Sequence, residues 1–190
     1  MTGPSLPLDQ DIECRVGRNL LVFQRIELNL KLYLAQSQVS GSLDDFPAKA
    51  RMQAEDAMKQ TLGQATHQLI QREVEGDSNA SLPENNFRFS TRCTYSDTEA
   101  RQQAHEAFDR IVKMRNELIH EFLVKFPLAQ RDADMEVTAY LDAQYKSACA
   151  VLSDTRVRLQ EFYELRRSFA EYLASPELAR IIAADGAPGE

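Results

Sequence analysis

The chain has 190 residues, of which 43% are hydrophobic and 27% are charged, with only seven glycines and seven prolines. These proportions predict a helix-rich globular domain and exclude a fibrous or disordered chain. The formal net charge of -7 argues against broad, nonspecific adhesion to nucleic acid, because phosphate affinity comes from clustered lysine and arginine, and leaves only a local basic cleft open.

The N-terminal half begins with an expected flexible arm at residues 1–10, which hold two prolines and a glycine. A single helical domain is predicted for residues 11–184, with a flexible tail at 185–190. Its first helix is expected from about Asp11 to Ala35, because apolar residues recur there at three-and-four spacing, and the turn residues V-S-G-S end it. Phe46-Pro47 begins a second helix that is rich in good helix formers.

Between about residues 63 and 96 the helical period fails, and we predict a small β-hairpin inserted between helices. The stretch N-N-F-R-F-S-T-R-C-T-Y-S alternates apolar and polar side chains, with Phe87 and Phe89 on one face, as in a strand. The segment T-H-Q-L-I-Q-R-E-V, residues 66–74, is its candidate partner strand, and a helix there is the alternative.

The C-terminal half is predicted to be helical throughout. Ser96 and Glu99 form a capping-box pattern for a helix that continues to about Phe126. From about residue 134 to Ser175 there is no proline or glycine and the apolar positions repeat every seven residues, which predicts one long helix of roughly 60 Å, with a break into two as the alternative. Pro176 begins a last short helix. The fold class is therefore all-α, an up-and-down helical bundle.

Several kinds of site are disfavoured by the sequence. The three cysteines are odd in number and widely spaced, which favours reduced thiols over disulfides or a zinc site. No glycine-rich phosphate loop or zinc-protease motif is present, so we expect no metal and no cofactor. No apolar run is long enough to cross a bilayer, and the first residues do not resemble a secretory leader, so we expect a cytoplasmic protein with no membrane partner.

The stretch R-N-E-L-I-H lies in the helix predicted from residue 96 to 126. A helical wheel places Arg115 within the apolar stripe of that helix. A guanidinium in a dry site needs an anion, so we predict an ion pair between Arg115 and Glu27, which lies in the apolar stripe of the first helix.

A second line on the same helix is polar. His120 shares it with Asn116, one turn earlier, and with Lys113 and His105. Titratable groups beside amide and ammonium donors are suitable for proton transfer next to a phosphate, which makes Lys113 and His105 candidate substrate-binding residues. The alternative is an ordinary solvated helix face.

R-N-E-L-I-H resembles the R-N-x-x-x-H form of the R-x(4–6)-H signature of HEPN domains, a helical family found in toxin ribonucleases, RNA-guided effectors and antiviral defence proteins. The Arg-Asn form is roughly a hundredfold rarer by chance than the loose form. The resemblance implies a metal-independent endoribonuclease that acts as a homodimer, in which the 2'-hydroxyl of RNA attacks the adjacent phosphate. It further implies that His120 is the general acid or base, that Arg115 stabilises the phosphorane, and that Asn116 holds the histidine or the phosphate.

The sequence thus leads to two hypotheses. The first is a cytoplasmic, homodimeric ribonuclease of a toxin or antiviral defence system that cuts RNA and has an antitoxin protein as a further partner. The second is a non-catalytic helical scaffold, in which Arg115 is tied to Glu27 and the long helix recruits a partner protein; the net charge of -7 favours it. In an α-helix, positions five apart point about 140° away from each other, so a two-fold dimer would be needed to bring the motif residues together.

Overall fold

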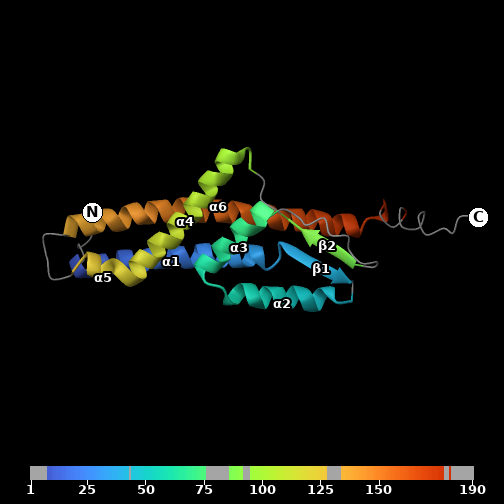
Figure 1. Cartoon of the computed structure of the whole chain (residues 1–190), viewed down its shortest axis with the longest axis horizontal. Helices are drawn as coiled ribbons and strands as arrows, with labels where there is room; N and C mark the ends of the chain where they lie inside the picture. Colours follow the sequence, from blue (N-terminus) through green and yellow to red (C-terminus); the bar gives the residue numbers. More distant parts are fainter. Residues whose placement is uncertain are drawn as a thin grey trace, which may run out of the picture.

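A computed structural model describes residues 8–42, 44–75, 86–91, 95–127, 134–177 and 180. The elements in chain order are α1 (Leu8–Leu34), β1 (Gln38–Ser42), α2 (Phe46–Lys59), α3 (Leu62–Glu75), β2 (Asn86–Ser90), α4 (Thr98–Asn116), the π-helical turn η1 (Glu117–Glu121), α5 (Phe122–Lys125) and α6 (Asp134–Leu173). The long helices reverse direction one after another along the chain, as Figure 1 shows. The predicted all-α, up-and-down bundle is confirmed, with a small two-stranded sheet added to it.

The ends of the chain fall mostly outside these ranges. Residues 8–10 already belong to α1, so the expected arm is shorter than predicted, and its remainder and the tail at 185–190 lie outside the described residues. Most of the last short helix expected after Pro176 does so too. Within the described part of the chain, no helix combines the length and the apolar character that a membrane span requires.

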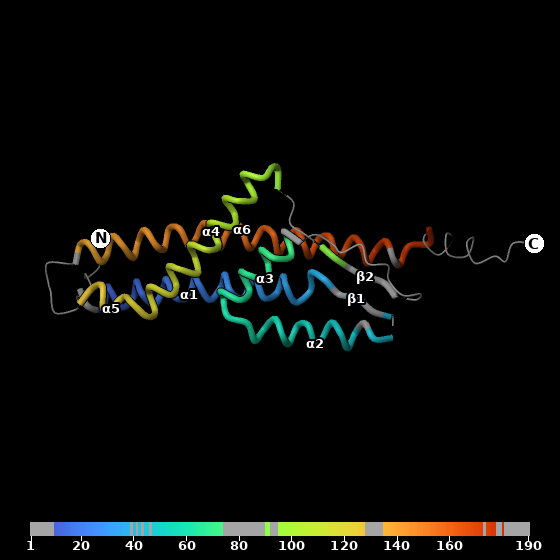
Figure 2. The backbone as a smooth tube through the Cα atoms, viewed as in Figure 1, coloured from blue at the N-terminus to red at the C-terminus, as the bar shows by residue number. Residues whose placement is uncertain are grey.

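Helices α1 and α6 form the long axis of the bundle and lie side by side in the same direction, as Figure 2 shows. Near their first turns Arg18 Nη2 donates to Asp142 Oδ1 at 2.8 Å, and near the other end the rings of Tyr33 and Phe162 meet edge-on at 5.5 Å. Position numbers therefore rise together along both helices. The 40 residues of α6 run without a break, as predicted, and span roughly 60 Å at about 1.5 Å per residue.

The hydrophobic core follows the α1–α6 contact and is closed by α3 on one side and by α4, η1 and α5 on the other. Its most completely buried large apolar side chains come from four helices: Phe23, Ile26, Leu34, Leu62, Phe108, Ile111 and Leu141. The three-and-four spacing seen in the sequence is the spacing of these inward-facing positions.

The small sheet corrects one expectation. β2 forms within the stretch predicted to be a strand, but its partner is β1, in an antiparallel register that sets Gln38 opposite Ser90. The partner strand predicted at residues 66–74 is wrong, and the helical alternative holds, because α3 buries Leu62, Ala65 and Leu69 against the core at helical spacing. The sheet thus joins the segment after α1 to the segment before α4.

The start of α4 corrects a second expectation. Asp97, rather than Ser96, is the N-cap: its Oδ1 accepts the Ala100 N–H at 2.7 Å. Ser96 Oγ instead donates to Asp97 Oδ2 at 3.2 Å. These bonds hold the pKa of the Asp97 carboxyl below its usual value, because they favour the ionised form.

Candidate functional site

The R-N-E-L-I-H stretch lies where the α-helical winding changes. Arg115 and Asn116 end α4, and the next four residues belong to η1. A π-helical turn carries i to i+5 hydrogen bonds and therefore takes up one residue more than an α-helical turn; such turns are rare and frequently occur at functional sites. The predicted helix through residue 126 is thus interrupted at the motif.

The wider turn changes which side chains reach the core. Leu118 and Phe122, four positions apart, are both buried, and Phe126 follows them. Ile119, which the α-helical wheel placed in the apolar stripe, is 43% exposed. The part of the stripe that includes Ile119 was therefore predicted wrongly, because the wheel assumed an unbroken α-helix.

The predicted pair between Arg115 and Glu27 does not form. Glu27 Oε1 lies 2.6 Å from Lys31 Nζ, a cation one turn further along α1, which is the spacing at which helical side chains meet. Arg115 is only half-buried, and its Nη1 donates to Asn116 Oδ1 at 3.0 Å. In the described part of the chain no carboxylate pairs with Arg115, so the guanidinium keeps donors for an external anion.

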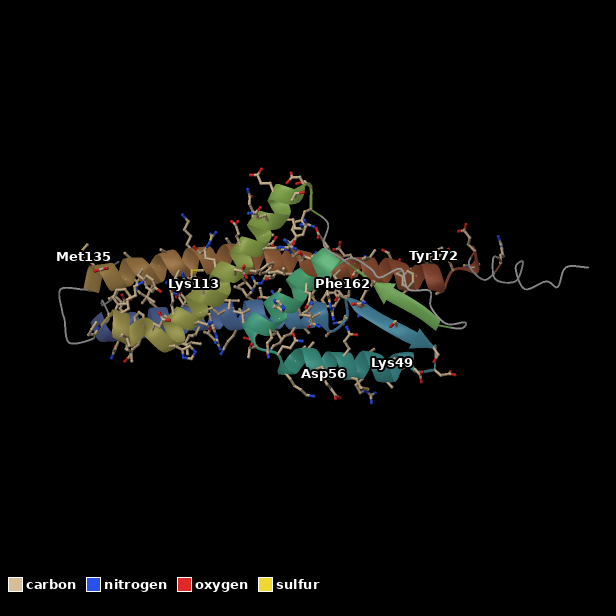
Figure 3. All side chains as sticks on the ribbon, in the orientation of Figure 1. Lys49, Asp56, Lys113, Met135, Phe162 and Tyr172 are labelled. Carbon is tan, nitrogen blue, oxygen red and sulfur yellow. The ribbon has the colours of Figure 1, made fainter. Side chains whose placement is uncertain are left out.

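The other motif residues face solvent. Asn116 and His120 are exposed, and so is Lys113, which Figure 3 labels on α4. No side chain of the described ranges hydrogen bonds to His120 or Lys113. The structure brings Arg115 and Asn116 into direct contact and leaves His120 accessible in the following π turn.

The motif is held from behind by α6. Tyr140 OH donates to Glu117 Oε2 at 3.1 Å, and Gln144 Nε2 donates to the Met114 carbonyl at 3.1 Å. Gln144 Oε1 in turn accepts from the fully buried Asn19 of α1 at 3.0 Å. Burial, together with the Glu117 carboxylate, raises the pKa of Tyr140 to about 12. The two ends of the hexapeptide's first turn are therefore anchored to α6, while its outer face stays open.

Apolar side chains flank the open face. Leu123 is 63% exposed and Val124 is 81% exposed, and both follow His120 within about one turn. With Ile119 they add apolar area to the polar motif residues; together these form the motif surface (Arg115, Asn116, Ile119, His120, Leu123 and Val124). Contiguous exposed apolar residues rimmed by polar ones are typical of a binding surface.

His105, a predicted substrate-binding residue, is not part of this surface. Its Nε2 lies 2.9 Å from Oε2 of Glu73 on α3, and its ring stands edge-on to Tyr95. Tyr95 OH donates to the same Glu73 oxygen at 2.9 Å, and Arg158 Nη1 donates to Tyr95 OH at 2.8 Å. These four residues form the Glu73 cluster, which links α3, α4 and α6.

The Glu73 cluster is largely withdrawn from water. The Glu73 side chain is 3% exposed, and its Oε1 lies 3.7 Å from Arg158 Nη1. Burial raises the pKa of Tyr95 well above its usual range, and the Arg158 guanidinium works against that shift. A buried carboxylate with a cation and two hydrogen-bonding rings is satisfied by protein groups, so the cluster serves to join the helices.

Sequence reasoning missed Glu73 and Arg158. Once α3 is a helix, Glu73 continues the line of Thr66 and Leu69, both buried, and so is a charged residue at a core-facing position. Arg158 likewise stands beside the heptad positions of α6. An acid and a base at inward-facing positions of two helices are the signal that predicts such a pair.

The structure offers little material for metal chemistry in the ranges it describes, where no group of three or more His, Cys, Asp or Glu side chains gathers around a common point. Cys14 and Cys149 are unbridged, and Cys93 lies outside the described residues. Comparison of the chain with protein families, with curated proteins and with solved structures finds no match.

Proposed function

We propose that this chain is a HEPN-like, metal-independent endoribonuclease that cleaves RNA as a homodimer. The observation that carries the proposal is the state of the three motif residues. Arg115 has no carboxylate partner among the described residues and is bonded to Asn116, and His120 is exposed one π turn later. An uncommitted guanidinium, an amide and an imidazole on one surface are the groups that phosphodiester cleavage by RNA's own hydroxyl requires.

The chemistry assigns one task to each group. His120 accepts the proton of the 2'-hydroxyl as the 2'-oxygen attacks phosphorus, and the bond between phosphorus and the 5'-oxygen breaks. The leaving 5'-oxygen takes a proton from the partner's His120. Arg115 neutralises the charge that builds up on the phosphorane, and Asn116 orients Arg115 through their hydrogen bond. The products are a 2',3'-cyclic phosphate and a 5'-hydroxyl.

The π turn supports this arrangement. Because a π turn takes up an extra residue, side chains five positions apart lie closer to the same side of the helix than they do in an α-helix. The divergence between Arg115 and His120 expected from the α-helical wheel is thereby reduced. The exposed Ile119, Leu123 and Val124 supply apolar area against which a second copy can pack with two-fold symmetry.

The resemblance to HEPN domains also carries the biological setting of the proposal. It is a cytoplasmic toxin or antiviral defence ribonuclease, held silent by an antitoxin protein. Removal of that protein, or its addition in excess, would then control the cleavage of cellular RNA.

The test compares variants of the chain's histidines on RNA. The purified protein is incubated with total RNA and with a short single-stranded RNA, in the presence of EDTA. We expect cleavage products with 2',3'-cyclic phosphate ends, and a loss of rate of at least about a hundredfold in His120→Ala. His67→Ala is the matched control, because His67 is an exposed histidine on α3, outside the motif surface. Equal RNA profiles for the wild type and His120→Ala would refute the proposal.

The competing function is a non-catalytic helical scaffold. The net charge of -7 favours it, as do the large apolar side chains exposed on the C-terminal half of α6, which include Val157, Leu165 and Tyr172. The tie between Arg115 and Glu27 that this hypothesis used is absent. A protein that folds normally, cleaves no RNA, and captures a specific partner through Leu165 and Tyr172 would establish the scaffold.

A further inference from the structure

A cleft of about 400 Å³ lies between α2 and α3, at the C-terminal end of α1. Its walls include Lys49, Gln53 and Asp56 of α2 and Arg72 of α3. Figure 3 shows Lys49 and Asp56 on α2, well apart from Lys113 on α4. The cleft is therefore separate from the motif surface, and its volume falls within the range of small-molecule sites.

Arg72 is the central cation of this cleft. Its Nη1 donates to the Leu34 carbonyl at 3.2 Å and to Ser37 Oγ at 2.7 Å, where the negative end of the α1 dipole favours a cation. Those bonds use one of its three nitrogens, although a guanidinium offers five N–H donors. No described carboxylate pairs with Arg72, and its Nε and Nη2 are not among the enclosed atoms that lack a partner. They therefore remain accessible to an anion.

The rest of the lining is polar and incompletely paired. Gln60 Nε2 donates to Gln68 Oε1 at 2.7 Å, but Gln60 Oε1 is buried without a hydrogen-bond partner. A buried acceptor left unpaired costs free energy, which a donor on a ligand would recover. Lys49 is half-exposed, and its only carboxylate contact in the described chain is a long one of 4.0 Å to Asp45.

Charge decides which anion fits. Arg72 and Lys49 bring two positive charges to the cleft, and the charge of Asp56 is offset by Lys59 at 3.2 Å. A phosphate monoester carries close to two negative charges at neutral pH and accepts hydrogen bonds from guanidinium and ammonium groups together, whereas a single carboxylate carries one. Burial also lowers the pKa of Arg72, which a bound anion would oppose.

We propose that the cleft between α2 and α3 binds a small phosphorylated molecule, with its phosphate against Arg72 and Lys49 and a donor of its polar body on Gln60. The site stands apart from the ribonuclease proposal, since none of these residues belongs to the motif surface. Its occupation would also stabilise the end of α1, because Arg72 contacts both the cleft and the Leu34 carbonyl.

The test is calorimetric titration of the full chain at low ionic strength with inorganic phosphate, adenosine 5'-monophosphate, adenosine and acetate. We expect saturable binding of the two phosphates only. Lys49→Gln should weaken it about fivefold to tenfold. Lys59→Gln is the matched control, because it removes a lysine charge from the same helix outside the cleft lining and should leave binding unchanged.

Each other outcome contradicts the proposal. Absence of heat with both phosphates removes the site. Equal weakening by Lys49→Gln and Lys59→Gln reduces the binding to diffuse attraction, and equal affinity for acetate removes the assignment to phosphate. Gln60→Ala offers a further check, since it should weaken binding of adenosine 5'-monophosphate more than that of inorganic phosphate.

Discussion

His105 and His120 lie on one continuous helical segment but have opposite surroundings. The His105 ring is held by the buried Glu73 carboxylate at 2.9 Å, and that carboxylate also accepts from Tyr95. His120 is exposed and makes no hydrogen bond to the described residues. The difference teaches that a shared polar line on a helical wheel does not make a shared site. A side chain committed to a buried partner stabilises the fold, whereas an uncommitted one is available to a ligand.

The largest effect should come from breaking the Glu73 cluster. Glu73→Ala leaves the guanidinium of Arg158 without its buried carboxylate and removes the acceptor of two further bonds. We expect a loss of about 3 kcal/mol in the free energy of unfolding, measured by urea denaturation. Glu55→Ala, an exposed glutamate of α2, is the control and should change that free energy by less than about 0.5 kcal/mol. Similar losses in both variants would contradict the account.

The second prediction compares the two histidines directly. His105→Gln should lower the free energy of unfolding by about 1 to 2 kcal/mol, because it weakens a hydrogen bond to a buried carboxylate. His120→Gln should change it by less than about 0.5 kcal/mol, as expected of an exposed side chain. RNA cleavage should show the reverse order, with a large loss only in His120→Gln. Equal destabilisation by the two substitutions would mean that His120 has a structural partner.

The smallest effect concerns two tyrosines, each of which donates to a carboxylate, Tyr95 in the cluster and Tyr140 behind the motif. The pKa of Tyr140 rises from 10.0 to about 12 in the fold, chiefly through burial, and that of Tyr95 rises too. A raised tyrosine pKa favours the neutral phenol in the native state. Its contribution to stability is therefore complete below about pH 10 and is lost as the pH climbs toward the folded value.

Melting temperatures between pH 9 and 12 measure this loss. We expect the alkaline fall to be reduced by Tyr140→Phe and reduced more by Tyr95→Phe, since Tyr95 is more deeply enclosed. A fall that is unchanged in both variants would mean that neither phenol is linked to alkaline unfolding.

The elements predicted well from the sequence are those with long, regular periodicity. The 27 residues of α1 and the 40 of α6 repeat their apolar positions many times, so the core-facing side is specified repeatedly. The strands were harder, because each has five residues and β1 contains a glycine, which locally indicates a turn. A strand this short is fixed by the partner it finds in space, which sequence pattern does not report.

The candidate site was predicted in its residues but not in their surroundings. Arg115, Asn116 and His120 were identified from their spacing, yet the wheel used for Arg115 assumed regular α-helical winding and so sent it toward Glu27. No residue of the motif is one that marks a π turn in advance. The partner of His105 was missed because Glu73 lay in a segment predicted to be a strand, where its inward direction was not apparent.

The π turn gives the length of the motif a mechanical meaning. Removing one residue from Glu117–Glu121 would let the segment wind as an α-helix and would rotate everything after it by about 100°. Phe122 and Phe126, both buried, would then swing away from the interior. Packing therefore enforces the number of residues between Arg115 and His120 independently of any chemistry, and shortened variants should be lost from a library selected only for folding.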